Sequence, residues 1–359
     1  MSALRLWLQA CLSGAALLSG VCAAQAQSLG QTPTMIVNYA AGGPTDIDAR
    51  ILARHLVKHL PGVSNIIVRN VPGGAGNIGI NQFGHATNQR DQLNIGFFTW
   101  NPLDQILDDP SLRIRYNDFK FVAGFRQGTI LYVRRDAGGG MSRPADLAKV
   151  PLIRAGALSA RDINTIRQRL ALDLLGVKYE TIVYTGMHDI EIGILRNDVQ
   201  LTATSLSGWY GSVKPTLVAD NVVMPLLQYD STMEEGSSGR SPDAPDVPSF
   251  SEVYRDIFGA NAAPSGPKWQ VLRLVSQIMD SLYRTVFMPP GAPSQAVAEL
   301  REGMQSLSRD PEFIAEYEKV VKFKPRVISS SQGERIINEL SATKPETADF
   351  IRKFIAEHH

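Results

Sequence analysis

The sequence predicts an α/β fold made of two blocks, each built on a mostly parallel sheet. Segments rich in β-forming residues alternate with amphipathic helical segments between residues 34 and 98, and the alternation returns between about residues 130 and 228. Strands separated by helices of this length are typical of parallel sheets with helices on both faces. The chain has 359 residues, which is enough for two domains that each bury a hydrophobic core.

The composition excludes several other classes of protein. With 36 Lys+Arg against 35 Asp+Glu, the net charge is +1, so bulk electrostatic attraction would hold neither a nucleic acid nor an anionic membrane. Hydrophobic residues make up 44% and charged residues 20%, a balance that favours a globular chain over a disordered one.

The first 26 residues are expected to be a cleaved signal peptide. Arg5 supplies a positive start, residues 6–21 form an apolar stretch, and Ala24 to Ala26 give the small-x-small pattern of a cleavage site. The apolar stretch is short for a bilayer span, although a retained anchor is the alternative. Cys11 and Cys22 would leave with this peptide, so the mature chain would have no disulfide. We therefore expect a periplasmic protein.

The first block begins with a strand over residues 34–39, a glycine loop over 40–46 and a helix. In that helix, apolar residues recur at helical spacing from Ile47 to Leu60, before a stop at Pro61-Gly62. A strand over 65–69 and a second glycine-rich loop over 71–79 lead into a second helix, and a third strand covers 93–98.

The second block and the C-terminal part continue the pattern. The expected elements are strands over 128–133, 181–184 and 199–203 and a helix over 164–175, then helices over 297–307, 311–322, 332–340 and from about 346. Residues 229–250 are polar and rich in Pro, Gly and Ser, which predicts a surface excursion.

The first glycine loop places flexible backbone directly before a helix. Free N–H groups at a helix start, together with the positive end of the helix dipole, form an anion site without a charged side chain. Thr45 or Asp46 can instead cap the helix. Asp46 would repel an anion, so capping or contact with an ammonium group suits it better.

The second glycine loop, Gly74 to Gly79, formally matches the G-x-G-x-x-G motif of dinucleotide sites. The connection from the preceding strand is longer than that motif prefers, and no strand ending in an acidic residue follows about twenty residues later. Two helix starts suited to anions in one domain are better explained by a ligand that carries a carboxylate.

Patterns for catalysis or metal binding are weak in this sequence. His55 and His59 lie four residues apart. No acidic residue stands between them and no third ligand is evident, so a solvated helix face is expected in place of a metal site. The sequence has no G-x-S-x-G elbow. We therefore expect no cofactor, no metal and no enzymatic activity; an exported enzyme acting on a small carboxylate is the alternative.

Five segments together resemble a known family. They are YAAGGPTDIDAR at residues 39–50, VRNVPGGAGNIG at 68–79, VYTG at 183–186, DAPDVPS at 243–249 and PPGAP at 289–293. In this order they resemble the Bug family, the periplasmic receptors of tripartite tricarboxylate transporters. The resemblance spans most of the mature chain.

The resemblance implies a two-lobed, periplasmic-binding-protein-like α/β fold with a ligand cleft between the lobes. It implies partners as well, namely a small organic carboxylate and the membrane permease subunits of a tripartite tricarboxylate-type transporter. A ligand sensor without a transporter is the alternative, and a monomer is expected. The implied ligand-binding positions are Gly43, Thr45, Asp46, Gly74 and Ala75 in the first lobe, and Ser159, Ala160, Tyr184, Thr185, Gly186, Thr204 and Ser205 in the second.

The lobes are expected to be discontinuous in sequence. Residues 27–130 and 231–359 would form the first lobe and residues 131–230 the second. Hinge crossings are expected at residues 125–133 and 226–231. The stretch 264–288 is longer than the family pattern suggests.

Local residues bear on the type of ligand. The candidates for stacking on a bulky or aromatic carboxylate are Tyr39, Trp100, Tyr184, Trp209 and Tyr210, of which Trp209 and Tyr210 are weaker than Tyr39 and Trp100. Each can equally pack against a helix. Thr204 stands where the family usually carries an acidic residue, which weakens the case for an amino-acid ligand. We expect affinity to come mainly from backbone donors beside Gly43 and Gly74.

Overall fold

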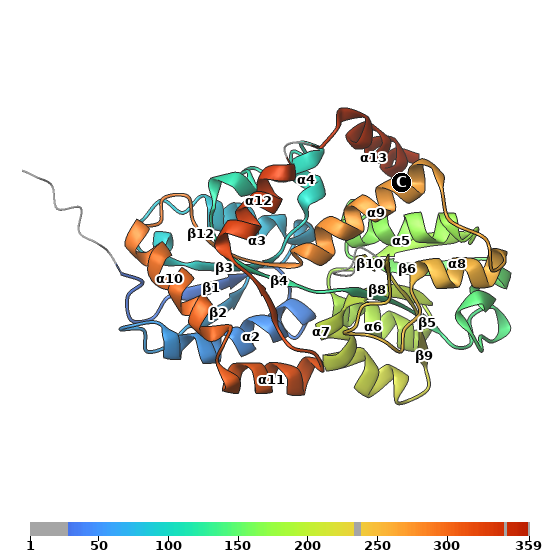
Figure 1. Ribbon diagram of the computed structural model, residues 1–359, viewed down its shortest axis with the longest axis horizontal. Coiled ribbons are helices and arrows are strands. Elements are labelled where there is room, and N and C mark those ends of the chain that lie inside the picture. The colour runs from blue at the N-terminus through green and yellow to red at the C-terminus, as the bar shows by residue number, and fades with distance from the viewer. Residues whose placement is uncertain (1–27, 233–237, 341–342, 358–359) are drawn as a thin grey trace, which may run out of the picture.

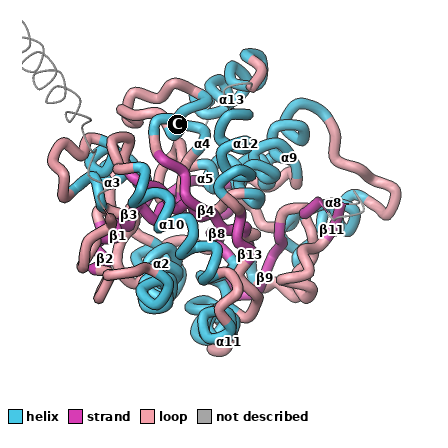
Figure 2. Tube along the Cα trace, turned by 60° about the vertical axis from the view of Figure 1, so that its left-hand side comes forward, coloured by secondary structure: helices cyan, strands magenta, loops and turns pink. Residues whose placement is uncertain are grey.

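The computed structural model describes residues 28–232, 238–340 and 343–357. The expected signal peptide lies outside the described residues. Two sheets form the centres of two lobes that lie side by side (Figure 1), which confirms the two-lobed α/β fold. Figure 2 shows the strands in the interior with helices around them. None of the helices in the described ranges has the length and hydropathy that a membrane crossing requires.

The first sheet has six strands in the order β13-β4-β12-β3-β1-β2. β12 and β13 run opposite to the other four strands, so the sheet is mostly parallel. The strand bounds are β1 Thr34–Val37, β2 Ile67–Asn70, β3 Ile95–Thr99, β4 Lys120–Arg126, β12 Arg284–Met288 and β13 Arg326–Ile328.

Both faces of the first sheet are covered by helices because both faces of its strands are apolar. Met35 and Val37 pack in one hydrophobic cluster, whereas Ile36 between them packs in another. On the first face lie α2 (Pro44–Leu56), α10 (Ser294–Leu307) and α11 (Pro311–Val321); on the second lie α3 (Asn77–Gly84), α4 (Pro102–Ile106) and α12 (Ser330–Leu340) (Figure 1).

The second sheet has five strands in the order β7-β6-β8-β5-β9, and β5 alone runs opposite to the others. Helix α5 covers one face, while α6 and a π-helix cover the other. The bounds are β5 Thr129–Arg134, β6 Ile153–Ala157, β7 Tyr179–Val183, β8 Leu201–Ser205, β9 Val223–Gln228, α5 Ile163–Leu174, α6 Met187–Arg196, α7 Leu206–Gly208 and the π-helix Trp209–Val218.

Two helices follow the second sheet in sequence and pack beside it. α8 (Phe250–Phe258) contacts β9, and α9 (Gly266–Ser281) lies along α5. Both belong to the stretch 231–359 that was expected to complete the first lobe. The chain passes from the first sheet to the second at residues 127–128, and from α9 back to the first sheet at residues 282–283.

The remaining elements are short or peripheral. They are α13 (Pro345–Glu357), the hairpin of β10 (Ser231–Thr232) and β11 (Ser238–Gly239), and the 3-10 turns Val57–His59, Gly74–Gly76, Asp91–Leu93, Tyr116–Asp118, Ala137–Gly139 and Pro144–Lys149.

Candidate functional site

A cavity of about 250 Å³ lies between the two lobes. The first lobe lines it with the first glycine loop, the end of β3 and the start of β12. The second lobe lines it with the ends of β6 and β8 and the starts of α5 and α6. Such an interlobe position is typical of a ligand cleft in a protein that closes on what it binds.

Three helices from both lobes begin at this cavity. Gly43 precedes α2 and Gly186 precedes α6, and neither helix start has a side-chain cap. Asp162 precedes α5 and does cap it, accepting the backbone N–H of Asn164 at 2.9 Å and of Thr165 at 3.3 Å. The uncapped starts of α2 and α6 therefore direct free N–H groups and positive dipole ends towards an anion in the cleft.

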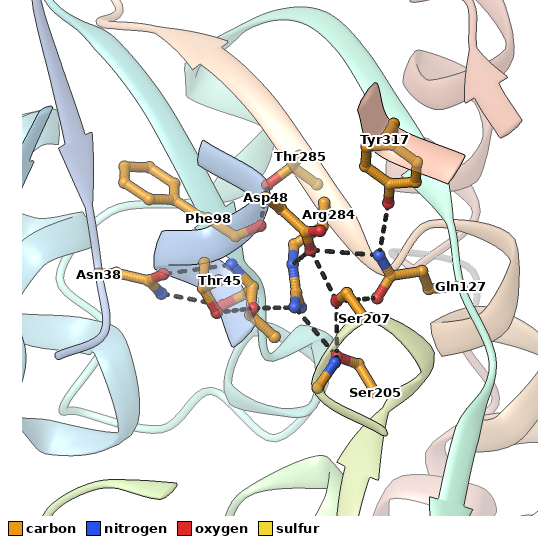
Figure 3. Close-up of polar contacts among 12 residues, drawn as sticks. Asn38, Thr45, Asp48, Phe98, Gln127, Ser205, Ser207, Arg284, Thr285 and Tyr317 are labelled. Carbon is orange, nitrogen blue, oxygen red and sulfur yellow. Dashed lines mark hydrogen bonds and ion pairs between the residues drawn. The ribbon is translucent and has the colours of Figure 1, made fainter. Parts of the chain in front are cut away.

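A buried arginine, Arg284, contributes a cation to the cavity wall. It is only 1% exposed. Its Nε donates to the Asp48 carboxylate at 2.9 Å, Nη1 to the Thr99 hydroxyl at 2.6 Å and Nη2 to the Ser205 hydroxyl at 3.3 Å (Figure 3). These bonds use three of the five guanidinium N–H groups. The other two have no hydrogen-bond partner among the described residues, which leaves them for a ligand.

Asp48 is the centre of a buried network that joins the two lobes (Figure 3). Besides Arg284, its Oδ2 accepts from the Gln127 amide at 3.1 Å and the Ser207 hydroxyl at 2.9 Å. Gln127 lies in the first crossing between lobes and also donates to the Tyr317 hydroxyl at 2.9 Å. Burial raises the pKa of Asp48, and Arg284 with the hydrogen bonds offsets only part of that rise. Because these bonds join residues of both lobes, a change in lobe position would disturb them.

Six of the residues expected at the site line this cavity: Tyr39, Gly43, Thr45, Gly186, Thr204 and Ser205. The Thr45 hydroxyl pairs with that of Thr99 at 2.8 Å. The Thr204 hydroxyl is buried and has no partner among the described residues, and Thr204 is 4% exposed. Buried hydroxyls normally have a hydrogen-bond partner, so this one is unusual in the cavity wall.

The other eight do not line it: Asp46, Gly74, Ala75, Trp100, Ser159, Ala160, Tyr184 and Thr185. Asp46 instead braces the first glycine loop, accepting from the Gly42 N–H at 2.9 Å and from Arg50 at 2.8 Å. Although burial acts to raise it, these hydrogen bonds hold the pKa of Asp46 below its usual value. Asp46 thus supports the loop as a capping residue does.

The loop residues of this group have local partners. The Ala75 carbonyl accepts the Tyr39 hydroxyl at 3.0 Å. In the second lobe, the Ser159 hydroxyl accepts the Arg161 N–H at 3.2 Å, and the Ala160 carbonyl accepts from Arg169. The Thr185 hydroxyl donates to the Asp189 carboxylate at 2.6 Å.

Most of the candidate aromatic side chains pack within their own lobes. Trp100 is 1% exposed and contacts Tyr116 edge-on at 5.3 Å between ring centroids. Tyr184 lies against α6, where a Cβ added at Gly193 would stand 2.5 Å from its hydroxyl. Tyr39 does line the cavity, and so does Tyr283, which sequence reasoning did not identify.

The glycines of the second loop have a packing reason. A Cβ at Gly76 would collide with the Asn38 side chain, and one at Gly79 would stand 2.6 Å from the Val71 carbonyl oxygen. These glycines let α3 approach the end of β1. Gly74 itself is exposed.

His55 on α2 and His59 in the 3-10 turn that follows α2 each contact a carboxylate on or beside α11. His55 Nε2 lies 2.7 Å from Glu316, and His59 Nε2 lies 2.8 Å from Asp310. The expected solvated face is wrong for His55, which is 6% exposed, because α11 covers it. Within the described ranges, no group of three or more His, Cys, Asp or Glu side chains is placed to hold a metal ion.

Sequence reasoning missed Arg284, Asp162 and Asp189, all of which line the cavity. Two of them carried a local signal. Arg284 is the single charged residue of an otherwise uncharged strand, RTVFM, and Asp162 stands where an N-cap precedes a helix.

No protein-family model and no curated protein matches this chain. Solved structures do match. The periplasmic binding protein BugD aligns with a TM-score of 0.66 at 19% identity, over 90% of this chain and 97% of that one. MatC from Rhodopseudomonas palustris with bound malate aligns with a TM-score of 0.64 at 17% identity, over 89% and 99%. Another R. palustris protein, solved with adipate, aligns with a TM-score of 0.67 at 19% identity, over 89% and 97%. The chain has the fold of these periplasmic binding proteins.

Proposed function

We propose that this chain is a Bug-family receptor that binds a small organic carboxylate between its lobes in the periplasm. It would deliver the ligand to the membrane permease of a tripartite tricarboxylate-type transporter. The five sequence segments and the shared fold support the family, and neighbours of that fold were solved with malate and adipate. The observation that carries the proposal is the meeting of two uncapped helix starts and Arg284 in one interlobe cavity.

This arrangement suits capture with closure. The first lobe offers the start of α2 and two guanidinium N–H groups, while the second lobe offers the start of α6 and the Thr204 hydroxyl. A ligand that contacts both sets gains more in the closed form than in the open one, so binding favours closure. The cavity has a volume of about 250 Å³, which suits a small ligand.

The same contacts favour a receptor over the exported enzyme. The hydroxyls of Thr99 and Ser205 are engaged with the Arg284 guanidinium and with neighbouring hydroxyls. Among the described residues, neither hydroxyl has a His, Asp or Glu side chain as a hydrogen-bond partner that could serve as its general base.

Calorimetry with the purified chain lacking residues 1–26 tests the proposal. A panel of short mono- and dicarboxylates should contain ligands that bind and raise the melting temperature. Arg284→Gln should weaken that binding by about 100-fold, since hydrogen bonds to charged groups contribute about 1.5–3 kcal/mol. Arg284→Lys should keep part of it, because a cation would remain.

Arg352→Gln is the matched control, because Arg352 pairs with Asp349 on the surface. Turnover of a bound carboxylate would identify an enzyme instead. No stabilisation by any carboxylate would reject a carboxylate receptor. Loss of ligand uptake by cells that lack the gene would support the transport role.

A further inference from the structure

We propose that the cleft wall beside α5 is built to accept hydrogen bonds, so that the ligand is a monocarboxylate with a hydroxyl or amino group at its far end. This inference rests on the proposed function and names its ligand class. It predicts that such ligands bind more tightly than dicarboxylates of equal length.

Two carboxylates stand in the second-lobe wall of the cavity. Asp162 is 4% exposed, lines the cavity and caps α5 through Oδ1. Asp189 occupies the first turn of α6 and accepts the Thr185 hydroxyl at 2.6 Å. Both side chains accept hydrogen bonds when ionised and donate none.

A third acceptor lies beside Asp162. The Asn164 Oδ1 is buried, and no described residue donates to it, although Asn164 lines the cavity. A buried carbonyl oxygen without a partner destabilises the fold unless a donor reaches it. A ligand hydroxyl or ammonium would supply that donor, whereas a second carboxylate would not.

Among the described residues, no cation forms an ion pair with either carboxylate, although the Arg167 charge acts on Asp162 from a distance. Arg284 already faces Asp48 at 2.9 Å. Arg167, on α5, is directed away to Asp280 at 2.9 Å and is 0% exposed. The remaining basic side chain in the lining, His188, lies exposed at the start of α6. The ligand carboxylate therefore belongs between Arg284 and the starts of α2 and α6, and its other end meets the acidic wall beside α5.

The sequence argument against an ammonium group depended on Thr204, which replaces an acidic residue. The fold brings Asp162 to the same cavity from another loop. The charge that an ammonium group requires is thus present at a different position.

Calorimetry at pH 7.5 on matched sets tests the inference. The four-carbon set is butanoate, 4-hydroxybutanoate, 4-aminobutanoate and succinate, and the six-carbon set is hexanoate, 6-hydroxyhexanoate, 6-aminohexanoate and adipate. In the set that binds, the hydroxy-terminated or the amino-terminated carboxylate should bind at least tenfold tighter than the dicarboxylate. The comparison of those two arms shows which donor the wall prefers.

Asp162→Asn removes the charge and keeps a good N-cap, as does Asp162→Ser. Each variant should melt normally and lose at least tenfold of the preference over the dicarboxylate. Asp310→Asn is the matched control, because Asp310 caps α11 outside the cavity lining; it should leave the preference unchanged.

The failures are distinguishable. If no carboxylate binds, the proposed function fails. If succinate or adipate binds as tightly as its partners and Asp162→Asn changes nothing, the receptor stands and the inference fails. Loss of dicarboxylate binding in His188→Ala would likewise overturn it, by assigning an anion subsite to that wall.

Discussion

At the scale of single residues, the cleft depends on charges held in fixed positions by neighbours. Arg284 is oriented by Asp48, Thr99 and Ser205, so its two remaining N–H groups are directed before any ligand arrives. Such preorganisation reduces the cost of ordering side chains on binding. Asp162 is held in the same way by the backbone of α5.

The titration of Asp162 predicts a pH-dependent ligand preference. Burial raises the pKa of Asp162 to about 6, and hydrogen bonds from Asn164 and Thr165 offset only part of that rise. The preference for an amino-terminated ligand over a dicarboxylate should fall as the pH drops through about 6, because protonation removes the negative charge. Calorimetry between pH 5 and 8 measures it.

Other ionisable groups act on this wall, so a control is needed. Tyr39, Tyr283 and Arg167 interact with the Asp162 charge, and burial raises the pKa of nearby Asp104 to about 7. The part of the pH dependence that survives in Asp162→Asn belongs to them. A full pH response in that variant would contradict the assignment.

The raised pKa of Asp162 also makes the stability of the folded chain depend on pH. Between about pH 4 and 6 the folded chain holds a proton that the unfolded chain has released. Stability from this group therefore decreases as the pH rises through that window. Asp162→Asn should flatten that part of the melting-temperature profile.

Gly43 and Gly74 were both expected to support binding, but their substitution should have different effects. Gly43 lines the cavity with an ordinary φ of −78°, so Gly43→Val should fold and lose binding by at least tenfold as its side chain crowds the helix start. Gly74 has φ +57° and is exposed outside the lining, so Gly74→Val should lower stability and spare binding. Melting curves with calorimetry separate the effects. Equal loss of binding in both folded variants would contradict this.

At the scale of elements, α9 is attached to the second lobe through one buried and one exposed ion pair. Arg167 on α5 contacts Asp280 at 2.9 Å, Ser276 at 3.1 Å and the face of Tyr229 at 3.9 Å. Lys268 pairs with Asp173 at the surface. Because β12 follows α9 directly, this attachment also positions Arg284.

The two pairs should differ in their contribution to stability. Arg167→Met leaves the part-buried Asp280 without its cation and should lower the free energy of unfolding by about 3 kcal/mol. Lys268→Met should cost less than about 1 kcal/mol, since water screens that pair. Urea unfolding measures both. Similar losses would show that burial is not what distinguishes them.

At the scale of the whole molecule, the lobes touch at the cleft mouth as well as at its floor. Arg161 of the second lobe contacts Asp109 of the first at 2.5 Å, and its carbonyl accepts from the Asn101 side chain at 3.4 Å. The floor contacts join Arg284 to Ser205 and Asp48 to Ser207. Polar contacts therefore join the lobes in two places.

The mouth contact should slow ligand release. Arg161→Gln should speed dissociation up to about fivefold, because a pair with a half-exposed partner contributes at most about 1 kcal/mol. The difference in dissociation rate between the variant and the native chain should shrink at high salt, because salt weakens the native ion pair. Stopped-flow release of a bound ligand measures this. Unchanged release at low salt would remove the contact from the closure mechanism.

By itself, the sequence determined the class of fold and the first helix start. The alternation over residues 34–98 predicted β1, α2, β2, α3 and β3, because the period of the apolar residues is local. It did not predict β4, β6, β9 or β12. These strands are buried on both faces, so they lack an alternating pattern, and glycine, proline or charged residues interrupt them.

Only the tertiary structure decided which of the candidate residues meet. The cavity wall joins Gly43, Asp162, Thr204 and Arg284, which are spread over more than 200 positions of the chain. These residues meet because the chain passes from the first sheet to the second and back again. Their meeting also depends on α9, whose packing on α5 has no local sequence pattern. Local patterns report which face of an element is apolar, whereas the meeting of distant loops depends on how the lobes pack together.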